Sequence, residues 1–270
     1  MPRGRYPIAK LAKDYDRVVV QKGLCELPDD GHKPLVTVLS FSSLGFRTAM
    51  SSPLSASLTA HVLSTPEYSY FVSLHADRTV LRIACQHALN PAETLAIAEE
   101  LGLDHPAIFS GSETIMSTDF MVLNSTSAVP TWRAVAVKRQ KDLDRRTLQK
   151  LEIERVYWQR RGVKWTLVLD TFISKIVVRN IEMVWRRYDR ASLPCDNSTT
   201  DAVILWLYPR ISAGKRAFAP TCLACDAEMG LQPGTALAIA YHAIISGIWP
   251  VDFRQPFLPN QPLPLLPSAP

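Results

Sequence analysis

The chain has 270 residues, of which 47% are hydrophobic and 20% are charged, and its formal net charge is +5. This composition excludes a disordered polypeptide and leaves room for one large domain or two ordinary ones. The sequence has no run of about 18 apolar residues, so we predict no membrane-spanning helix, and the N-terminal residues lack the apolar core of a secretory signal. The five scattered cysteines are typical of free thiols in a reducing compartment, and we therefore expect a cytoplasmic protein.

Strand and helix patterns alternate through the first 171 residues. Strands are predicted at residues 35–41, 79–84, 120–123, 133–138 and 164–169. Helices are predicted from Pro66 onward and over residues 91–101 and 143–161. The mixture predicts one α/β domain over residues 1–171.

After residue 171 the strand patterns almost vanish. Helices are predicted over residues 172–190, 199–208, 222–229 and 235–246, with a turn into a short strand or wing over residues 246–253. Several short helices followed by a short strand are typical of a winged-helix module. We therefore predict an all-α, winged-helix-like domain over residues 172–270, whose proline-rich tail from Pro256 is extended or disordered.

Positive charge is concentrated in one stretch of the chain. Residues 133–161 hold ten Lys or Arg against four Asp or Glu, an excess that accounts for that of the whole chain. Such a stretch suits the backbone of DNA, whereas most runs of charge are solvated helix faces. The charge is compatible with a polyanionic partner without requiring one.

Two carboxylates and a lysine form the candidate site. Asp119 begins one predicted strand, Lys138 ends another, and Glu67 lies near the apolar face of its helix. Two carboxylates bind a hard cation such as Mg²⁺, which activates water and offsets the charge of a phosphate, while a lysine orients the water or stabilises that phosphate. The Val137 carbonyl is a further candidate ligand for the metal. The alternative is that these residues have no catalytic role, because Asp and Lys at strand ends often serve only solubility. Spacing alone favours this alternative.

Other catalytic systems leave weaker signals. The sequence contains no Gly-x-Ser-x-Gly, no His-Glu-x-x-His and no glycine-rich phosphate loop. Cys222 and Cys225 form a lone Cys-x-x-Cys without the second pair that a zinc ribbon needs. We expect these two to be structural thiols.

The motifs together resemble those of the TnsA endonucleases of bacterial cut-and-paste transposons. The resemblance runs from about His61 to Leu263 and depends on the order and spacing of its pieces. These include His61-Val-Leu-Ser-x-x-Glu67-x-x-Tyr70-Phe71, Thr118-Asp119-Phe120, Ala136-Val137-Lys138, Lys150-Leu-Glu-Ile-Glu-Arg-x-Tyr-Trp158 and Gly230-Leu-x-Pro-Gly234.

The resemblance implies a restriction-endonuclease-like first domain and a winged-helix second domain. It implies Mg²⁺-dependent cutting of one strand, on the 5′ side, at transposon ends in double-stranded DNA. It also implies two partners in the bacterial cytoplasm, a DDE-type transposase that cuts the other strand and an AAA+ ATPase that regulates both. Carried over residue by residue, Glu67 and Asp119 are the metal-binding carboxylates and Lys138 is the catalytic lysine.

One departure from the family concerns the site itself. The family usually has Gln two residues before the lysine, where this chain has Ala136, and we expect weakened or altered metal binding. Gln86 and Glu154 are candidates for residues that contact the catalytic side chains without binding the metal themselves. Two other functions stay open: a non-catalytic module that docks the transposase and the ATPase, and a stand-alone restriction-type nuclease.

Overall fold

A computed structural model describes residues 19–29, 31–40, 45–57, 59–106, 115–125 and 128–267. The chain divides into two compact units. The first contains Met1–Phe71 and Thr79–Ile173, and the second contains Val72–Arg78 and Ser174–Pro270. In the described part of the chain, no helix is long and apolar enough to cross a membrane.

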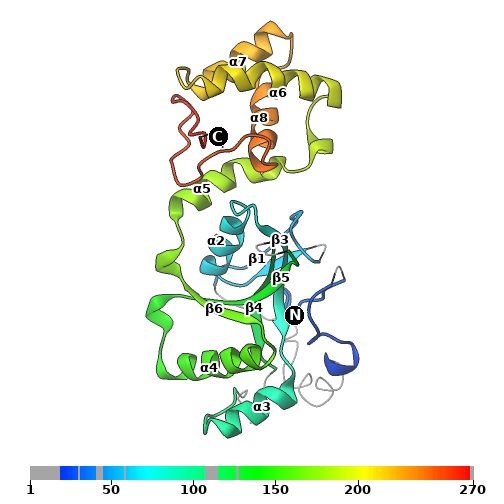
Figure 1. Ribbon diagram of the computed structural model, residues 1–270, viewed down its shortest axis with the longest axis vertical. Coiled ribbons are helices and arrows are strands. Elements are labelled where there is room, and N and C mark those ends of the chain that lie inside the picture. The colour runs from blue at the N-terminus through cyan, green and yellow to red at the C-terminus, as the bar shows by residue number, and fades with distance from the viewer. Residues whose placement is uncertain are drawn as a thin grey trace, which may run out of the picture. The chain divides into compact units, whose positions relative to one another are not determined.

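A four-stranded sheet forms the centre of the first unit (Figure 1). Its strands, in spatial order, are β3 (Val80–Ala88), β4 (Ser117–Asn124), β5 (Thr131–Lys138) and β6 (Lys164–Leu169). The pairs β3–β4 and β4–β5 are antiparallel, whereas β5–β6 is parallel because the helix α4 (Arg145–Arg160) forms the crossover between them. A separate two-stranded antiparallel sheet consists of β1 (Thr48–Met50) and β2 (Ala60–Val62).

Helices cover both faces of the four-stranded sheet (Figure 1). On one face, Phe71 of α2 (Thr65–Leu74) stacks on Phe120 of β4 with ring centroids 6.3 Å apart. On the other face, Met121 joins a buried core with α4 and with α3 (Pro91–Glu100). Phe120 and Met121 are neighbours in a strand and therefore point to opposite faces. The α/β fold of the first unit follows from this alternation.

The structure contradicts one of the predicted strands. Residues 35–40 form turns and irregular chain, and residue 41 lies outside the described residues. The Thr37 N–H donates to the Ser40 hydroxyl at 2.9 Å, and the Ser40 N–H donates to the Thr37 carbonyl at 3.0 Å. Local bonds of this kind compete with pairing in a sheet.

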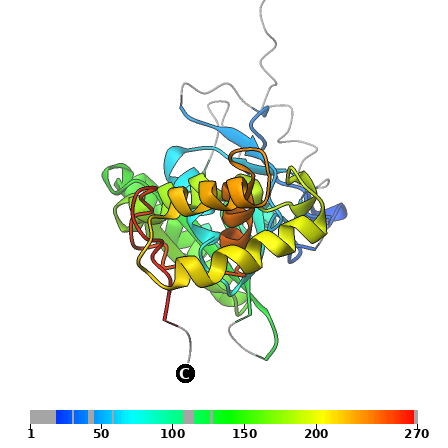
Figure 2. The ribbon, with the colours of Figure 1, turned by 90° about the horizontal axis from the view of Figure 1, so that it is seen from above.

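The second unit is helical, as the sequence predicted. It contains α5 (Lys175–Val184), α6 (Asn197–Ser212), α7 (Phe218–Glu228) and α8 (Thr235–Ile245), and the last three pack together (Figure 2). The predicted helix over residues 172–190 is shorter than expected, because Ser174 caps its start and a 3-10 turn replaces it after Val184. Asp226 fixes the start of α8, where its carboxylate accepts the N–H groups of Gly234 and Ala236 at 2.7 Å each.

The proline-rich tail is described as far as residue 267, and it is not extended throughout, because it turns at residues 259–260. Its carbonyls at Gln261 and Pro259 accept the N–H groups of Phe218 and Ala219 at 2.9 Å each. These bonds satisfy the start of α7, which has no side-chain cap. Where a wing was predicted, the described residues of this unit form a single antiparallel bridge between Val251 and Leu265. The winged-helix assignment stays a prediction.

Candidate active site

Asp119 and Lys138 meet where β4 and β5 separate. The last paired residues of these strands are Phe120 and Val135, so the Val137 N–H has no strand partner on that side and donates to Oδ2 of Asp119 at 2.7 Å. Lys138 Nζ donates to the same oxygen at 2.8 Å. Oδ1 of Asp119 makes no hydrogen bond to a described residue, and one carboxylate oxygen is left for a further ligand.

The Val137 carbonyl is directed towards the same place. The N–H and C=O groups of one strand residue point to the same side of the strand. Because the N–H of Val137 reaches Asp119, its carbonyl is also directed to the β4 side. The structure thus brings Asp119, Val137 and Lys138 together at these strand ends.

Glu67 is fixed at the start of α2 by a capping arrangement. Its N–H donates to the Ser64 hydroxyl at 3.3 Å, while its Oε1 accepts from that hydroxyl at 2.8 Å and its Oε2 accepts from the Leu63 N–H at 2.9 Å. The Ser-x-x-Glu spacing is the sequence signal of a capping box, and it could have predicted this role of Glu67. Glu67 therefore has a structural role in addition to any catalytic one.

Gln86 connects Glu67 to the end of β4. Its side-chain amide donates to Oε2 of Glu67 at 3.1 Å, and its Oε1 accepts from the Ser117 hydroxyl at 3.2 Å. Gln86 is 3% exposed. The charge of Asp119 also acts on Glu67, so all three predicted catalytic side chains share one electrostatic environment.

Glu154 of α4 bonds to Thr118, the residue that precedes Asp119. Its Oε1 accepts from the Thr118 hydroxyl at 2.8 Å, and that hydroxyl accepts from the Trp158 indole N–H at 2.7 Å. Glu152 is held elsewhere, by two bonds from Arg155 at 2.7 and 2.8 Å. Of the two glutamates on this helix, Glu154 is the one that bonds to the neighbour of Asp119 and whose ionisation is affected by the charges of Asp119 and Lys138.

Two of these acids resist ionisation. Burial, followed by the charge of Asp119, raises the pKa of Glu67 to about 7 and that of Glu154 to about 7. Burial lowers the pKa of Lys138, but the Asp119 carboxylate, with smaller effects of Glu154 and Glu67, raises that pKa well above its ordinary value. One lysine does not neutralise three acids once Glu67 and Glu154 ionise, so an added cation would favour their charged forms.

The donor atoms fit a hard divalent cation whose shell is completed by water and substrate. In the described part of the chain, no three His, Cys, Asp or Glu are arranged to hold a metal by themselves. Mg²⁺ usually takes one or two carboxylates and fills its other positions with water and phosphate oxygens. Asp119, Glu67 and the Val137 carbonyl are oxygen donors of this type, and the excess of acid favours the cation.

Ala136 leaves an apolar position in the site. It is fully buried and pairs with Leu167 of β6. Continuing the register beyond Phe120 and Val135 places Ala136 opposite Asp119. A methyl group here offers no oxygen, so any metal must rely on the remaining donors.

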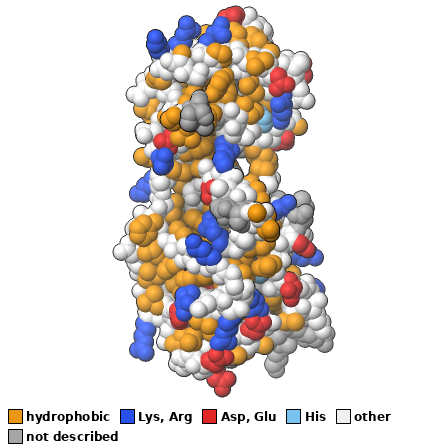
Figure 3. All heavy atoms as spheres, in the orientation of Figure 1, with side chains coloured by type: hydrophobic (Ala, Val, Ile, Leu, Met, Phe, Trp, Pro, Cys, Tyr) orange, Lys and Arg blue, Asp and Glu red, His pale blue; other side chains and the backbone are white. Residues whose placement is uncertain are grey.

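Most of the basic stretch is already engaged within the protein. Arg155, Arg160 and Arg161 form ion pairs with Glu152, Glu100 and Glu93. Three exposed cations, Lys141, Arg145 and Lys150, make no ion pair with any described residue. On the face drawn in Figure 3, Lys and Arg side chains are scattered among acidic and hydrophobic ones and do not form one large patch.

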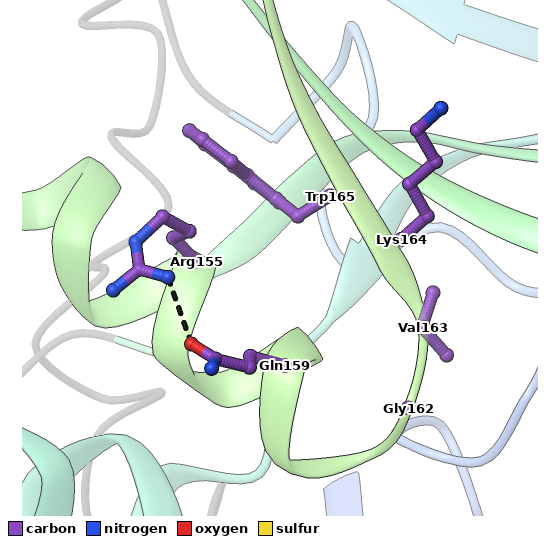
Figure 4. Close-up of a pocket in the computed structure, with 6 residues that line it drawn as sticks. All are labelled: Arg155, Gln159, Gly162, Val163, Lys164 and Trp165. Atoms are coloured by element: carbon purple, nitrogen blue, oxygen red, sulfur yellow. Dashed lines mark hydrogen bonds between the residues drawn. The ribbon is translucent and has the colours of Figure 1, made fainter.

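A hollow of about 450 Å³ lies between α4 and the start of β6 (Figure 4). Its lining consists of Arg155, Gln159, Gly162, Val163, Lys164 and Trp165. Arg155 donates to Gln159 at 2.8 Å, Trp165 points towards α4, and Lys164 extends to the other side of the strand. None of the candidate catalytic residues lines this hollow.

The chain is similar to known proteins in two respects. Residues 77–170 match the family described as TnsA-like endonuclease N terminal. Over 183 residues, the chain is 34% identical to the transposon Tn7 transposition protein TnsA of Escherichia coli. The aligned part covers 66% of this chain and 66% of that protein, so the chain spans about two thirds of its relative's length. The family match contains Asp119 and Lys138, whereas Glu67 precedes it.

Proposed function

Since the chain belongs to the TnsA-like endonuclease family, we propose that it hydrolyses one DNA strand, on the 5′ side, at the ends of a transposon. It acts as one subunit of a heteromeric transposase in the bacterial cytoplasm. The observation that carries the proposal is the meeting of Asp119 and Lys138 at 2.8 Å, with Glu67 in the same electrostatic environment. An acidic site that holds a cation beside a fixed lysine suits phosphodiester hydrolysis.

The cofactor of this proposal is Mg²⁺. A bound divalent cation supplies an activated water and offsets charge on the scissile phosphate. Glu67, Asp119 and the Val137 carbonyl would hold it. Asp119 keeps Oδ2 for the lysine and the backbone, and presents Oδ1 to the cation.

Lys138 acts in this proposal as a fixed positive charge. Its pKa is raised by Asp119 despite burial, so it stays protonated throughout the physiological range. A protonated lysine cannot accept a proton from water. Its role is therefore to stabilise the charged phosphate or to orient the attacking water, and another group takes the proton.

Glu154 supports the site in this proposal through its bond from Thr118. It is 5% exposed and has its charge suppressed by burial and by Asp119. A cation close to Asp119 would favour the ionised form of Glu154. The Thr118 and Trp158 bonds then fix the orientation of that carboxylate.

The partners in this proposal are double-stranded DNA at the transposon ends, a DDE-type transposase and an AAA+ ATPase regulator. Lys141, Arg145 and Lys150 are exposed, lie beyond the active-site strand and would contact the DNA backbone. The helical second unit, which we propose is winged-helix-like, would bind DNA or the regulator. Coupling of the nuclease to these partners would restrict cutting to assembled ends.

The competing function is a non-catalytic module that only docks these partners. The apolar Ala136 in the site is the observation that favours it. Asp119→Ala distinguishes the two functions when cleavage of each strand is followed separately in the complete complex. We expect loss of the 5′-side cut with the cut of the other strand retained. Unchanged 5′-side cutting would show that Asp119 is not needed for cleavage and would favour the non-catalytic docking function.

A stand-alone nuclease is the second alternative. It predicts that the purified chain alone cuts linear DNA in the presence of Mg²⁺. Our proposal expects such cutting only after the transposase and ATPase are added, with the Asp119→Ala chain as the inactive control.

A further inference from the structure

Gln86 has an unusual backbone conformation for a residue inside a strand. Its φ is +51°, and among the described residues every other positive φ belongs to a glycine. Its neighbours Cys85 and His87 both remain paired with β4. A left-handed conformation is unfavourable for a residue with a Cβ, and it persists only where the surroundings enforce it.

Residues 19–29 and 31–35, which we call the N-terminal brace, lie against the outer edge of β3 at this point. The Leu35 N–H donates to the Gln86 carbonyl at 2.8 Å. The His32 ring lies 2.9 Å from the Cys85 carbonyl. Val19 and Cys25 are buried in a small cluster with Ala88, which anchors the brace to the same strand. The brace thus supplies the partners that an edge strand otherwise lacks.

The enforced conformation directs the Gln86 amide at Glu67. In its ionised form Glu67 only accepts hydrogen bonds, which matches the observed arrangement: the amide nitrogen of Gln86 faces Glu67 and its amide oxygen faces the Ser117 hydroxyl. Rotation of φ to an ordinary negative value would turn the Cα–Cβ bond and remove the amide from Glu67. The left-handed backbone conformation of Gln86 is therefore required for the hydrogen bond between its amide and Glu67.

We propose that Gln86 is a positioning residue that holds Glu67 in its metal-binding orientation, and that the N-terminal brace keeps Gln86 in place. The inference rests on the proposed function, because Glu67 must be a ligand of a divalent cation. It goes further in giving the brace a role at the active site. Residues that orient metal ligands typically contribute about tenfold or more to metal affinity.

The test measures binding of Mn²⁺ alone to the full chain by calorimetry. Gln86→Met keeps the volume of the side chain and removes its amide, and we expect affinity for Mn²⁺ to fall about tenfold. The control Gln140→Met makes the same chemical change at an exposed position and should leave affinity unchanged. Affinity of Gln86→Met equal to that of the wild type would overturn the inference.

Leu35 provides the test of the brace. Leu35→Pro removes the N–H that binds the Gln86 carbonyl, and we expect the same loss of Mn²⁺ affinity. Leu35→Ala keeps that N–H and should bind Mn²⁺ like the wild type. Combined with Gln86→Met, Leu35→Pro should add no further loss, since both act through Glu67. Full affinity of Leu35→Pro, or equal losses in the Pro and Ala variants, would overturn the role of the brace.

Two further variants keep the outcome decisive. If Gln86→Met does not fold, Ser117→Ala removes the hydroxyl that orients the amide and should weaken Mn²⁺ binding by a smaller factor; unchanged binding would count against the inference. Asp119→Asn should abolish binding. If Asp119→Asn abolishes binding and Gln86→Met does not weaken it, the inference fails and the proposed site stands. If Asp119→Asn binds like the wild type, the proposed site fails as well.

Discussion

Lys138 and the Val137 N–H share one oxygen of Asp119, at 2.8 and 2.7 Å. This sharing fixes the carboxylate at the point where β4 and β5 separate, and it leaves the other oxygen without a described hydrogen-bond partner. This geometry leads to the proposal that the two carboxylate oxygens of Asp119 have different roles. One oxygen holds the lysine, and in the proposed function the other would bind the cation.

Lys138→Met tests the lysine as a fixed charge. We expect cleavage of the 5′-side strand to fall by about 10²–10³-fold, the usual loss for a missing electrostatic contact in a transition state. Lys138→Arg keeps the charge but changes its geometry and should restore part of the rate. Strand-specific cleavage in the complete complex is the measurement. Lys164→Met, on an exposed residue, is the control and should cut normally.

The capping role of Glu67 separates from its proposed catalytic role. Ser64→Ala removes the hydroxyl that bonds to Glu67 and should cost about 1 kcal/mol of unfolding free energy, as the loss of a cap does. It should lose far less cleavage activity than Glu67→Gln, because the carboxylate remains and keeps its bonds from the Leu63 N–H and the Gln86 amide. Glu67→Gln should reduce cleavage at least 100-fold, because a neutral amide is a poor cation ligand. Denaturant unfolding and cleavage assays together check both variants, and equal activity in the two would contradict this separation.

Stability should depend on pH through Glu67 and Glu154. Their pKa values rise from an ordinary 4.5 to about 7 in the folded protein. The folded state therefore binds protons more tightly than the unfolded state, and its stability is greatest below the unfolded pKa. As the pH rises towards 7, stability should fall by up to about 3 kcal/mol for each group.

Denaturant titrations between pH 4.5 and 8 measure this loss. Asp119→Asn removes a charge that raises both pKa values, so the slope should become shallower. Mg²⁺ should restore stability above pH 7, because it favours the ionised acids. A flat profile without Mg²⁺ would show that the two acids ionise normally.

Salt dependence of DNA binding tests the exposed cations. Replacing Lys141, Arg145 and Lys150 by Ala should lower the slope of log affinity against log salt by about 3, roughly one for each phosphate contact. The double variant Arg160→Ala with Glu100→Ala removes an ion pair without changing the net charge, and it should leave the slope unchanged. Filter binding or anisotropy over a range of salt concentrations measures the slopes. Equal slopes in all three proteins would remove these residues from the DNA interface.

Local sequence predicted much of the fold because its signals act over a few residues. Asn90 accepts from the N–H groups of Ala92 and Glu93 and caps α3 as expected. Gly162 ends α4 with a positive φ of 65°. The strand predicted over residues 35–41 was wrong for residues 35–40, since hydrophobicity alone does not report the competing bonds between Thr37 and Ser40.

The contacts that orient the site residues could not be predicted from local sequence patterns, because they join residues that are distant in sequence. Gln86, which has the left-handed conformation, bonds through its carbonyl to Leu35, which is distant in sequence. The choice of Glu154 over Glu152 depends on Thr118 of another strand and on the competing pair with Arg155. Such arrangements arise from tertiary packing, and a single sequence carries no short-range signal for them.

The proposed function requires Asp119 and Glu67 to bind one divalent cation. Crystals soaked in Mn²⁺ test it most directly through anomalous density. We expect a peak within about 2.0–2.6 Å of Oδ1 of Asp119, with the Val137 carbonyl and Glu67 among its other ligands or held through water. The proposed function would be contradicted if crystals that bind Mn²⁺ elsewhere show no peak at this position. It would also be contradicted if no peak is present and the carboxylates of Asp119 and Glu67 are turned away from each other.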